Sequence, residues 1–151
     1  MKNEAFIAWH GSPYMFDRFD FSKLRDGLGV FFTESREAAE YYARRDGRFP
    51  NGTVRQYRLT FRNVLRVHQG EEYAEWIVKR DGEKTSRDVR RRLIKAGYDG
   101  IRVEYHDGLV EYVAFSNRDI TPMSDNVNVN LKPSGDRLGV VNASRGGGNH
   151  P

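Results

Sequence analysis

One acidic residue, Glu111, lies in the middle of an otherwise apolar segment that runs from Leu109 to Phe115. Side chains two residues apart share one face of a strand, so Glu111 shares its face with Leu109 and Val113. Burying a carboxylate is costly unless its charge is paired or used. Glu111 is therefore either an exposed residue of a hairpin or a carboxylate held at a core or cleft for chemistry.

A histidine, His10, closes another apolar segment, residues 6–10, and is followed by Gly11 and Ser12. Glycine has no side chain, so a ligand could approach the backbone closely at this point. Such a histidine either binds a ligand at the end of a strand or lies in the core, hydrogen-bonded to a carbonyl group.

Three aromatic residues, Phe31, Phe32 and Tyr42, also allow two interpretations. Tyr42 lies on the inner face of a helix predicted over residues 36–45, where Ala38, Ala39 and Ala43 share that face. Aromatic rings in such positions either pack in the core or form a stacking platform for a planar ligand.

The composition excludes several classes of protein. The 151 residues include no cysteine, which rules out disulfide scaffolds and cysteine nucleophiles and suits a reducing compartment. No apolar run reaches the roughly 18 residues of a membrane span, and the N-terminus lacks the pattern of a signal peptide. We therefore expect a cytoplasmic protein without a membrane partner. We also expect no metal, because the histidines lack metal-ligand spacing: His10, His68, His106 and His150.

A predicted helix, which Ser86 caps and Gly97 ends, carries a cluster of cations in a chain of net charge +4. The cluster consists of Arg87, Arg90, Arg91, Arg92 and Lys95. It forms either a face for nucleic acid or an acidic partner, or an ordinary solvated helix face. No aromatic residues interleave with the cations, so a stacking platform for single strands is not indicated.

The periodicity predicts three helices and five or six strands in mixed order, which is typical of an α+β fold with a largely antiparallel sheet. The strongest local signal is the hairpin turn at Asp107-Gly108, which joins a strand at 101–105 to one at 110–115. The other expected strands are residues 6–10, 30–32, 57–61 and 64–67, and the helices are 36–45, 71–80 and 86–96.

The composition changes near residue 121. Residues 1–121 hold the predicted elements, so we expect one domain there. Residues 122–151 are rich in Asn, Gly and Ser and contain no aromatic residue, which predicts a flexible tail. Val127, Val129 and Leu131 alternate and could instead add a short edge strand.

Five segments in fixed order carry a family resemblance: WHGS, FDRFDFSK, GLGVFFTES, AAEYYA and EYVAFSNRDI. The series resembles the ADP-ribosyltransferase fold in its diphtheria-toxin-like, or H-Y-E, branch. It is most similar to the small transferase domains of phage and mobile-element polyvalent proteins. The resemblance covers residues 1–121 and implies split, mostly antiparallel β-sheets with flanking helices.

The resemblance also implies roles for residues that bind NAD. His10 would hold a ribose hydroxyl, the backbone of Gly11 would bond the nicotinamide carboxamide, and Ser12 would lie beside it. The ring of Tyr42 would stack on the nicotinamide. Glu111 would be the catalytic glutamate, which stabilises the oxocarbenium-like ribose formed when the nicotinamide leaves.

Two positions depart from the family pattern. Phe31 occupies the first tyrosine position, eleven residues before Tyr42, and lacks the hydroxyl group; Phe32 follows it in the expected NAD site. Leu109, two residues before Glu111, stands where arginine-specific relatives usually have Glu or Gln. This difference argues against arginine as the acceptor.

The function implied by the resemblance is transfer of one ADP-ribose from NAD, as cosubstrate, to a macromolecule, more readily a protein than a nucleic acid. A phage or bacterial effector that acts as a monomer fits such a small transferase. The alternatives are an NAD glycohydrolase toxin and a catalytically weak module that binds NAD, nucleic acid or a protein. Residues 33–35 and 46–53 are the expected target-facing loops.

Overall fold

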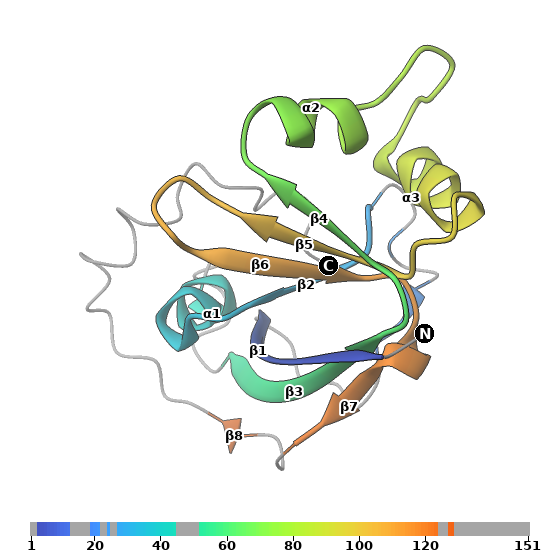
Figure 1. The fold of residues 1–151 in the computed structure, drawn as a ribbon. Coiled ribbons are helices and arrows are strands. Elements are labelled where there is room, and N and C mark those ends of the chain that lie inside the picture. The colour runs from blue at the N-terminus through green and yellow to red at the C-terminus, as the bar shows by residue number, and fades with distance from the viewer. Residues whose placement is uncertain are drawn as a thin grey trace.

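The computed structural model describes residues 3–12, 19–21, 24, 27–44, 52–123 and 127–128. Figure 1 shows the arrangement of these elements. In chain order they are β1 (Glu4–Ser12), β2 (Val30–Thr33), α1 (Arg36–Arg44), β3 (Thr53–Phe61), β4 (Val64–His68), α2 (Glu71–Trp76), α3 (Ser86–Lys95), β5 (Gly100–Glu104), β6 (Val110–Ala114), a 3-10 turn (Asn117–Asp119), β7 (Ile120–Pro122) and β8 (Val127–Asn128).

The strands form one hydrogen-bonded path in the order β4-β5-β6-β2-β1-β3-β7, with β8 also paired to β3. β4 and β5 run parallel, and the other neighbouring strands of the described sheet run antiparallel. The described register of β1 and β2 joins them at Trp9 and Thr33, so the sheet divides there into two diverging halves (Figure 1). This arrangement confirms the predicted α+β fold with a split, mostly antiparallel sheet.

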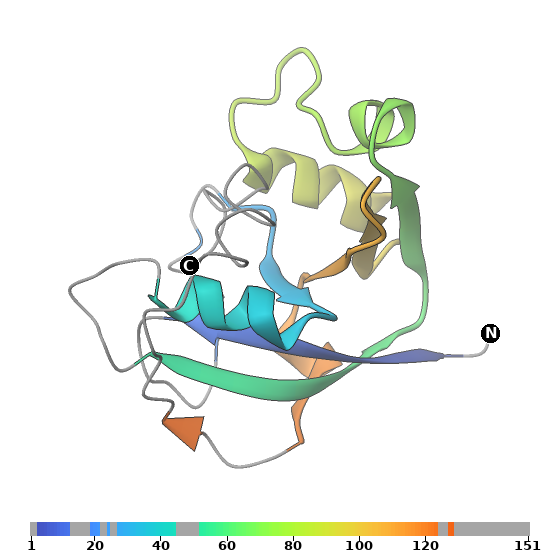
Figure 2. The same ribbon diagram turned by 90° about the vertical axis from the view of Figure 1, so that its left-hand side faces the viewer.

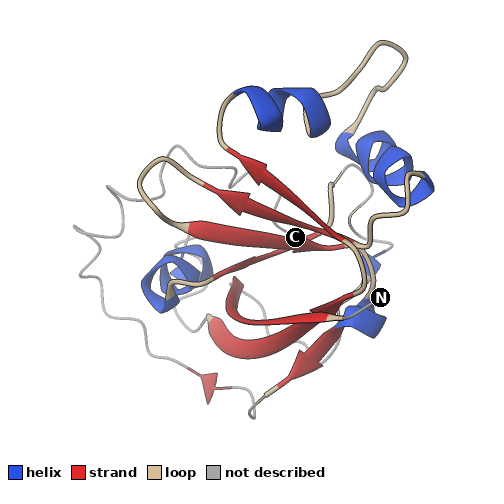
Figure 3. Cartoon of the chain, viewed as in Figure 1, coloured by secondary structure: helices blue, strands red, loops and turns tan. Residues whose placement is uncertain are grey.

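Two larger apolar cores among the described residues support these halves. The inner core joins residues of both halves: Ala8, Tyr57, Leu59 and Phe61 from β1 and β3, and Val30, Phe32, Val110, Tyr112 and Ala114 from β2 and β6. The outer core lies on the other face of the β4-β5-β6-β2 half, where α2 and α3 cover it (Figure 3). Each face of the central strand β6 is therefore covered, and all five of its residues are buried.

Helix α1 packs on β1 and β3, beside the junction of the two halves (Figure 2). It begins as predicted, because the hydroxyl of Ser35 accepts a hydrogen bond of 3.1 Å from the backbone N–H of Ala38. The side chains of Ala38, Ala39, Tyr42 and Ala43 are buried, which confirms the predicted inner face. The helix therefore directs Tyr42 toward the sheet.

The hairpin at Asp107-Gly108 forms as predicted. Gly108 has φ +87°, a backbone conformation that favours glycine, and its N–H donates to the carbonyl of Tyr105 at 2.9 Å. The turn places β6 beside β5 with Glu111 directly opposite Val103. The register of Glu111 is thus set by the turn.

Several boundaries differ from the prediction; β1, for example, runs from Glu4 to Ser12 rather than over residues 6–10. β3 begins at Thr53 rather than residue 57, because the polar residues at its start continue the pairing with β1. α2 ends at Trp76 rather than residue 80. The N-cap of α3 is Thr85 rather than Ser86, and its backbone N–H donates to the carboxylate of Asp88 at 3.2 Å.

The segment after residue 119 pairs with β3. β7 and β8 lie along it, with Val54 opposite Val127. A short strand therefore forms at the first of the alternating valines. Val129, Leu131 and the rest of the tail lie outside the described residues, and the domain boundary at residue 121 stays a prediction.

Candidate active site

Glu111 is buried, with 2% of its surface exposed, at the second position of β6. Its direct neighbours in the sheet are Thr33 on β2 and Val103 on β5. The exposed-hairpin interpretation is therefore wrong, because strands flank β6 on both sides and helices cover its outer face. A carboxylate in such a place needs hydrogen-bond donors.

Tyrosine hydroxyls provide those donors. The hydroxyl of Tyr105 donates to Oε1 of Glu111 at 2.7 Å, and the hydroxyl of Tyr42 on α1 also hydrogen-bonds to the carboxylate. Burial raises the pKa of Tyr73 on α2, and the nearby charge of Glu111 raises it further. We refer to Tyr42, Tyr73 and Tyr105 as the tyrosine cluster.

Burial among uncharged side chains changes the pKa of Glu111. Burial raises it to about 7, although the hydrogen bonds from Tyr105 and Tyr42 lower it. Burial and the charge of Glu111 raise the pKa of Tyr105, which therefore stays a neutral donor near pH 7. The site thus holds a carboxylate that changes its charge close to neutral pH, as a catalytic acid or base requires.

His10 lies at the end of β1 and is buried. Its Nδ1 is 2.7 Å from the carbonyl oxygen of Phe31, and burial lowers its pKa to about 4. A neutral imidazole that donates from Nδ1 carries its lone pair on Nε2, which can accept a hydrogen bond from a hydroxyl group. The structure therefore confirms the interpretation of His10 as a core histidine bonded to a carbonyl, and its contact with a ligand stays a prediction.

The two phenylalanines of β2 separate the predicted residues into two groups. Phe31 lies opposite Val113, so it shares the outer face with Glu111 and packs in the outer core. Phe32 faces the inner core, where its ring centroid is 5.5 Å from that of His10. The structure brings Tyr42 to Glu111 on the outer face and His10 to Phe32 in the inner core, so these two pairs lie on different faces of the sheet.

The backbone of helix α1 lies very close to Gly11, so this glycine is needed for packing within the protein. A Cβ at Gly11 would lie 1.7 Å from the carbonyl oxygen of Ala39. The close packing of α1 on β1 therefore requires glycine here, and Tyr42 lies one helical turn after Ala39. Ser12 is buried at the end of β1, opposite Thr53. The expected bond from Gly11 to a carboxamide stays a prediction, as does the role of Ser12.

Comparison with known proteins decides the family. Residues 3–129 match the family described as ADP-ribosyltransferase in polyvalent proteins. The chain belongs to this family. The resemblance found in the sequence is thereby confirmed. A solved structure, described as an anti-CRISPR protein, aligns with 16% identity and a TM-score of 0.47 over 82% of this chain and 96% of that chain. No curated protein matches the chain.

The site fits the substrate of an ADP-ribosyltransferase, NAD, in the chemistry of its groups. Breaking the bond between ribose and nicotinamide develops positive charge on the ribose, which a buried carboxylate can stabilise. Neutral His10 offers an acceptor for a sugar hydroxyl. Among the described residues, no group of three or more His, Asp or Glu side chains could hold a metal ion. The described helices include none that is long and apolar enough to cross a membrane.

Sequence reasoning missed two members of the tyrosine cluster in this ADP-ribosyltransferase domain. Tyr105 had a usable signal: it comes two residues after Val103, which the hairpin register places opposite Glu111. Tyr73 had none, because it reaches the site from α2, whose position depends on the tertiary fold.

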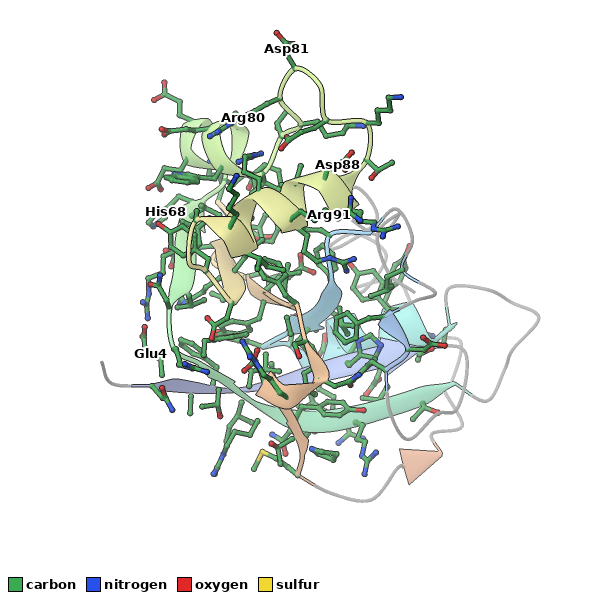
Figure 4. All side chains as sticks on the ribbon, turned by 90° about the vertical axis from the view of Figure 1, so that its right-hand side faces the viewer. Glu4, His68, Arg80, Asp81, Asp88 and Arg91 are labelled. Carbon is green, nitrogen blue, oxygen red and sulfur yellow. The ribbon has the colours of Figure 1, made fainter. Side chains whose placement is uncertain are left out.

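The cation cluster of α3 divides into two kinds of residue. Arg92 is structural: its side chain donates to Glu83 at 2.7 Å and to the carbonyl of Trp76 at 3.0 Å. Arg87, Arg91 and Lys95 are exposed, and Figure 4 shows Arg91 beside Asp88 on α3. The cationic face is thus smaller than the sequence suggests.

One of the two predicted target-facing loops begins at the site. Thr33 lies opposite Glu111, and its hydroxyl accepts a hydrogen bond of 3.1 Å from the backbone N–H of Ser35. Most of the second loop, residues 46–51, lies outside the described residues.

Proposed function

We propose that the protein is a mono-ADP-ribosyltransferase that cleaves the nicotinamide–ribose bond of NAD and transfers ADP-ribose to a macromolecule. The observation that carries this proposal is the buried carboxylate of Glu111, held by tyrosine hydroxyls in a domain of the ADP-ribosyltransferase family. The same residue is the one that the resemblance assigns to catalysis.

In the proposed reaction, Glu111 acts on the ribose. The bond between the nicotinamide nitrogen and ribose C1′ breaks, its electron pair leaves with nicotinamide, and an acceptor oxygen or nitrogen forms the new bond to C1′ and loses its proton. The ionised Glu111 stabilises the positive ribose and can help to remove that proton. Because the tyrosine cluster is neutral, it does not compete with the ribose for the carboxylate charge.

His10 and Tyr42 would position the substrate. Nε2 of neutral His10 accepts a ribose hydroxyl, while Nδ1 keeps the ring oriented through its bond to the carbonyl of Phe31. The ring of Tyr42 forms a wall for the nicotinamide plane, and the backbone of Gly11 lies on the adjoining strand. Aromatic walls exclude water from the reacting bond.

We propose a protein acceptor rather than a nucleic acid. The exposed cations of α3 suit an acidic protein surface as well as a nucleic acid, but no aromatic residues interleave with them to stack on the bases of a single strand. Leu109 beside the site argues against an arginine acceptor. A small transferase of this kind suits a phage or bacterial effector that acts as a monomer in the cytoplasm.

Phe31 favours a second candidate, a module of the same fold with little or no activity. Its ring lies on the face of Glu111, where the family pattern has a tyrosine, and it packs in the apolar outer core. The hydrogen bond that the tyrosine hydroxyl would make to the substrate is absent. An NAD glycohydrolase is the remaining alternative, in which water is the acceptor.

The test uses NAD labelled on its adenine side, incubated in bacterial lysate with the protein or with Glu111→Ala. Glu104→Ala is the matched control, because Glu104 is a carboxylate on the neighbouring strand β5 that hydrogen-bonds to His68 instead. We expect label on protein with the unsubstituted chain and the control, and none with Glu111→Ala. Nicotinamide release without label would indicate a glycohydrolase, and NAD binding without release would indicate a binding module.

A further inference from the structure

Tyr105 makes a hydrogen bond to the catalytic carboxylate that nothing in the family resemblance assigns. We propose that Tyr105 is a positioning residue, whose hydroxyl orients Glu111 and stabilises its charged form. The inference rests on the proposed function in one respect, because the effect on turnover requires that Glu111 acts on NAD. The contact itself is independent of that function.

The hairpin fixes the place of Tyr105. Its backbone N–H donates to the carbonyl of Leu109 at 2.9 Å, and its own carbonyl accepts from Gly108 at 2.9 Å. Its side chain leaves the sheet on the same face as Val103, the residue opposite Glu111. The ring thus spans the hairpin diagonally, and its hydroxyl reaches Oε1 of Glu111 at 2.7 Å.

The described groups around Glu111 show why the hydrogen bond from Tyr105 matters for its charge. They come from three elements: Tyr105 from the hairpin, Tyr42 from α1 and Tyr73 from α2. No lysine or arginine of the described residues contributes to the pKa of Glu111. Hydroxyl donors therefore have to stabilise the negative charge, and Tyr42 also has to serve as the stacking wall. Tyr105 is the donor with no other expected role.

Tyr105→Phe keeps the ring and removes the donor. Loss of one hydrogen bond to a buried carboxylate should raise the pKa of Glu111 by about one pH unit. Because less of Glu111 is ionised, the rate of nicotinamide release at pH 7 should then fall by about fivefold and recover at alkaline pH. The KM for NAD should change little, since Tyr105 acts through Glu111.

The experiment follows the side-chain carboxyl signal of Glu111 by carbon-13 NMR during a pH titration of the full chain. Glu111→Gln identifies the signal. Tyr98→Phe is the matched control, because Tyr98 is a partly buried tyrosine of the same outer core whose ring packs on Trp76 instead. We expect a higher midpoint for Glu111 in Tyr105→Phe and an unchanged one in Tyr98→Phe.

A measurement on the unsubstituted chain tests the same contact even if Tyr105→Phe does not fold. The ring carbon that bears the hydroxyl of Tyr105 should change its chemical shift with the same midpoint as Glu111. An unmoved Glu111 midpoint in a folded Tyr105→Phe, or no response of the Tyr105 signal, would overturn the proposal. If both signals behave as expected but no nicotinamide is released, the positioning contact stands and the proposed function fails.

Discussion

Among the described residues, neutral hydroxyls rather than cations hydrogen-bond to the carboxylate of Glu111. An arginine or lysine beside it would lower its pKa and offset its charge before the substrate arrives. Donation from Tyr105 and Tyr42 leaves the pKa of Glu111 at about 7 and leaves its charge available to a positive ribose. The environment thus suits a group whose task is to stabilise a transient cation.

The ionisation of Glu111 should make nicotinamide release depend on pH. The carboxylate form of Glu111 is the active one, so the rate of nicotinamide release should rise with pH and reach half its maximum near pH 7. Initial rates of the purified protein, measured from about pH 5 to about pH 9, two units on either side of the pKa, give the pH of the half-maximal rate. A half-maximum near the ordinary pKa of a glutamate would contradict the role of burial.

At the scale of the elements, the position of α1 decides whether Tyr42 reaches Glu111. Gly11→Ala would place a Cβ 1.7 Å from the carbonyl oxygen of Ala39, so α1 would have to move away from β1. We expect a loss of about 3 kcal/mol in the free energy of unfolding. Chemical denaturation measures it.

The control for this prediction is Gly27→Ala. A Cβ at Gly27 would meet its nearest atoms, in Leu24, at 3.5 Å, which is ordinary contact, and the φ of Gly27 does not demand glycine. Its free energy of unfolding should change by no more than about 1 kcal/mol. Equal stability of the two variants would show that α1 does not need the close approach at Gly11.

Several elements could be predicted because their signals are local. The spacing of Ala38, Ala39, Tyr42 and Ala43 reports one helix face, and Asp107-Gly108 specifies a hairpin whatever surrounds it. The start of β3 could not be predicted in this way. Its polar residues are held by pairing with β1, which lies far away in the sequence.

The candidate site was predictable to a similar extent. Glu111, His10 and Tyr42 were found because each combines an informative local pattern with the family resemblance. The position of Tyr73 and the ion pair of Arg92 with Glu83 depend on where α2 and α3 pack. The spacing of residues along the sequence does not predict that packing. The separation of Phe31 and Phe32 onto opposite faces follows from strand geometry, but which core each enters depends on the whole sheet.

At the scale of the whole molecule, Glu111 and His10 give opposite pH dependences of stability. The pKa of Glu111 is raised to about 7, so the folded state binds more protons than the unfolded state between about pH 4.5 and 7, and stability falls as pH rises through that range. The pKa of His10 is lowered to about 4, so its contribution is lost as pH falls from about 6.5 toward 4.

Glu111→Gln separates these two effects, because His10 is the same in both proteins. The variant should exceed the unsubstituted chain by about 1–3 kcal/mol in the free energy of unfolding above pH 7, and the excess should decline as pH falls toward about 4.5. Denaturant titrations at about pH 5, near the lower end of this range, and at about pH 8, one unit above its upper end, measure the difference. A variant that is less stable than the parent at pH 8 would contradict the cost of burying the charge.

The role of Glu111 is best tested by nicotinamide release from NAD at about pH 8, measured for the purified protein, Glu111→Gln and Glu104→Gln. Glu111→Gln keeps the size of the side chain and removes its charge, so we expect its rate to fall by about a hundredfold or more. Glu104→Gln should release nicotinamide at the unsubstituted rate. Equal rates for the unsubstituted chain and Glu111→Gln would show that the buried carboxylate does not take part in cleaving the nicotinamide–ribose bond.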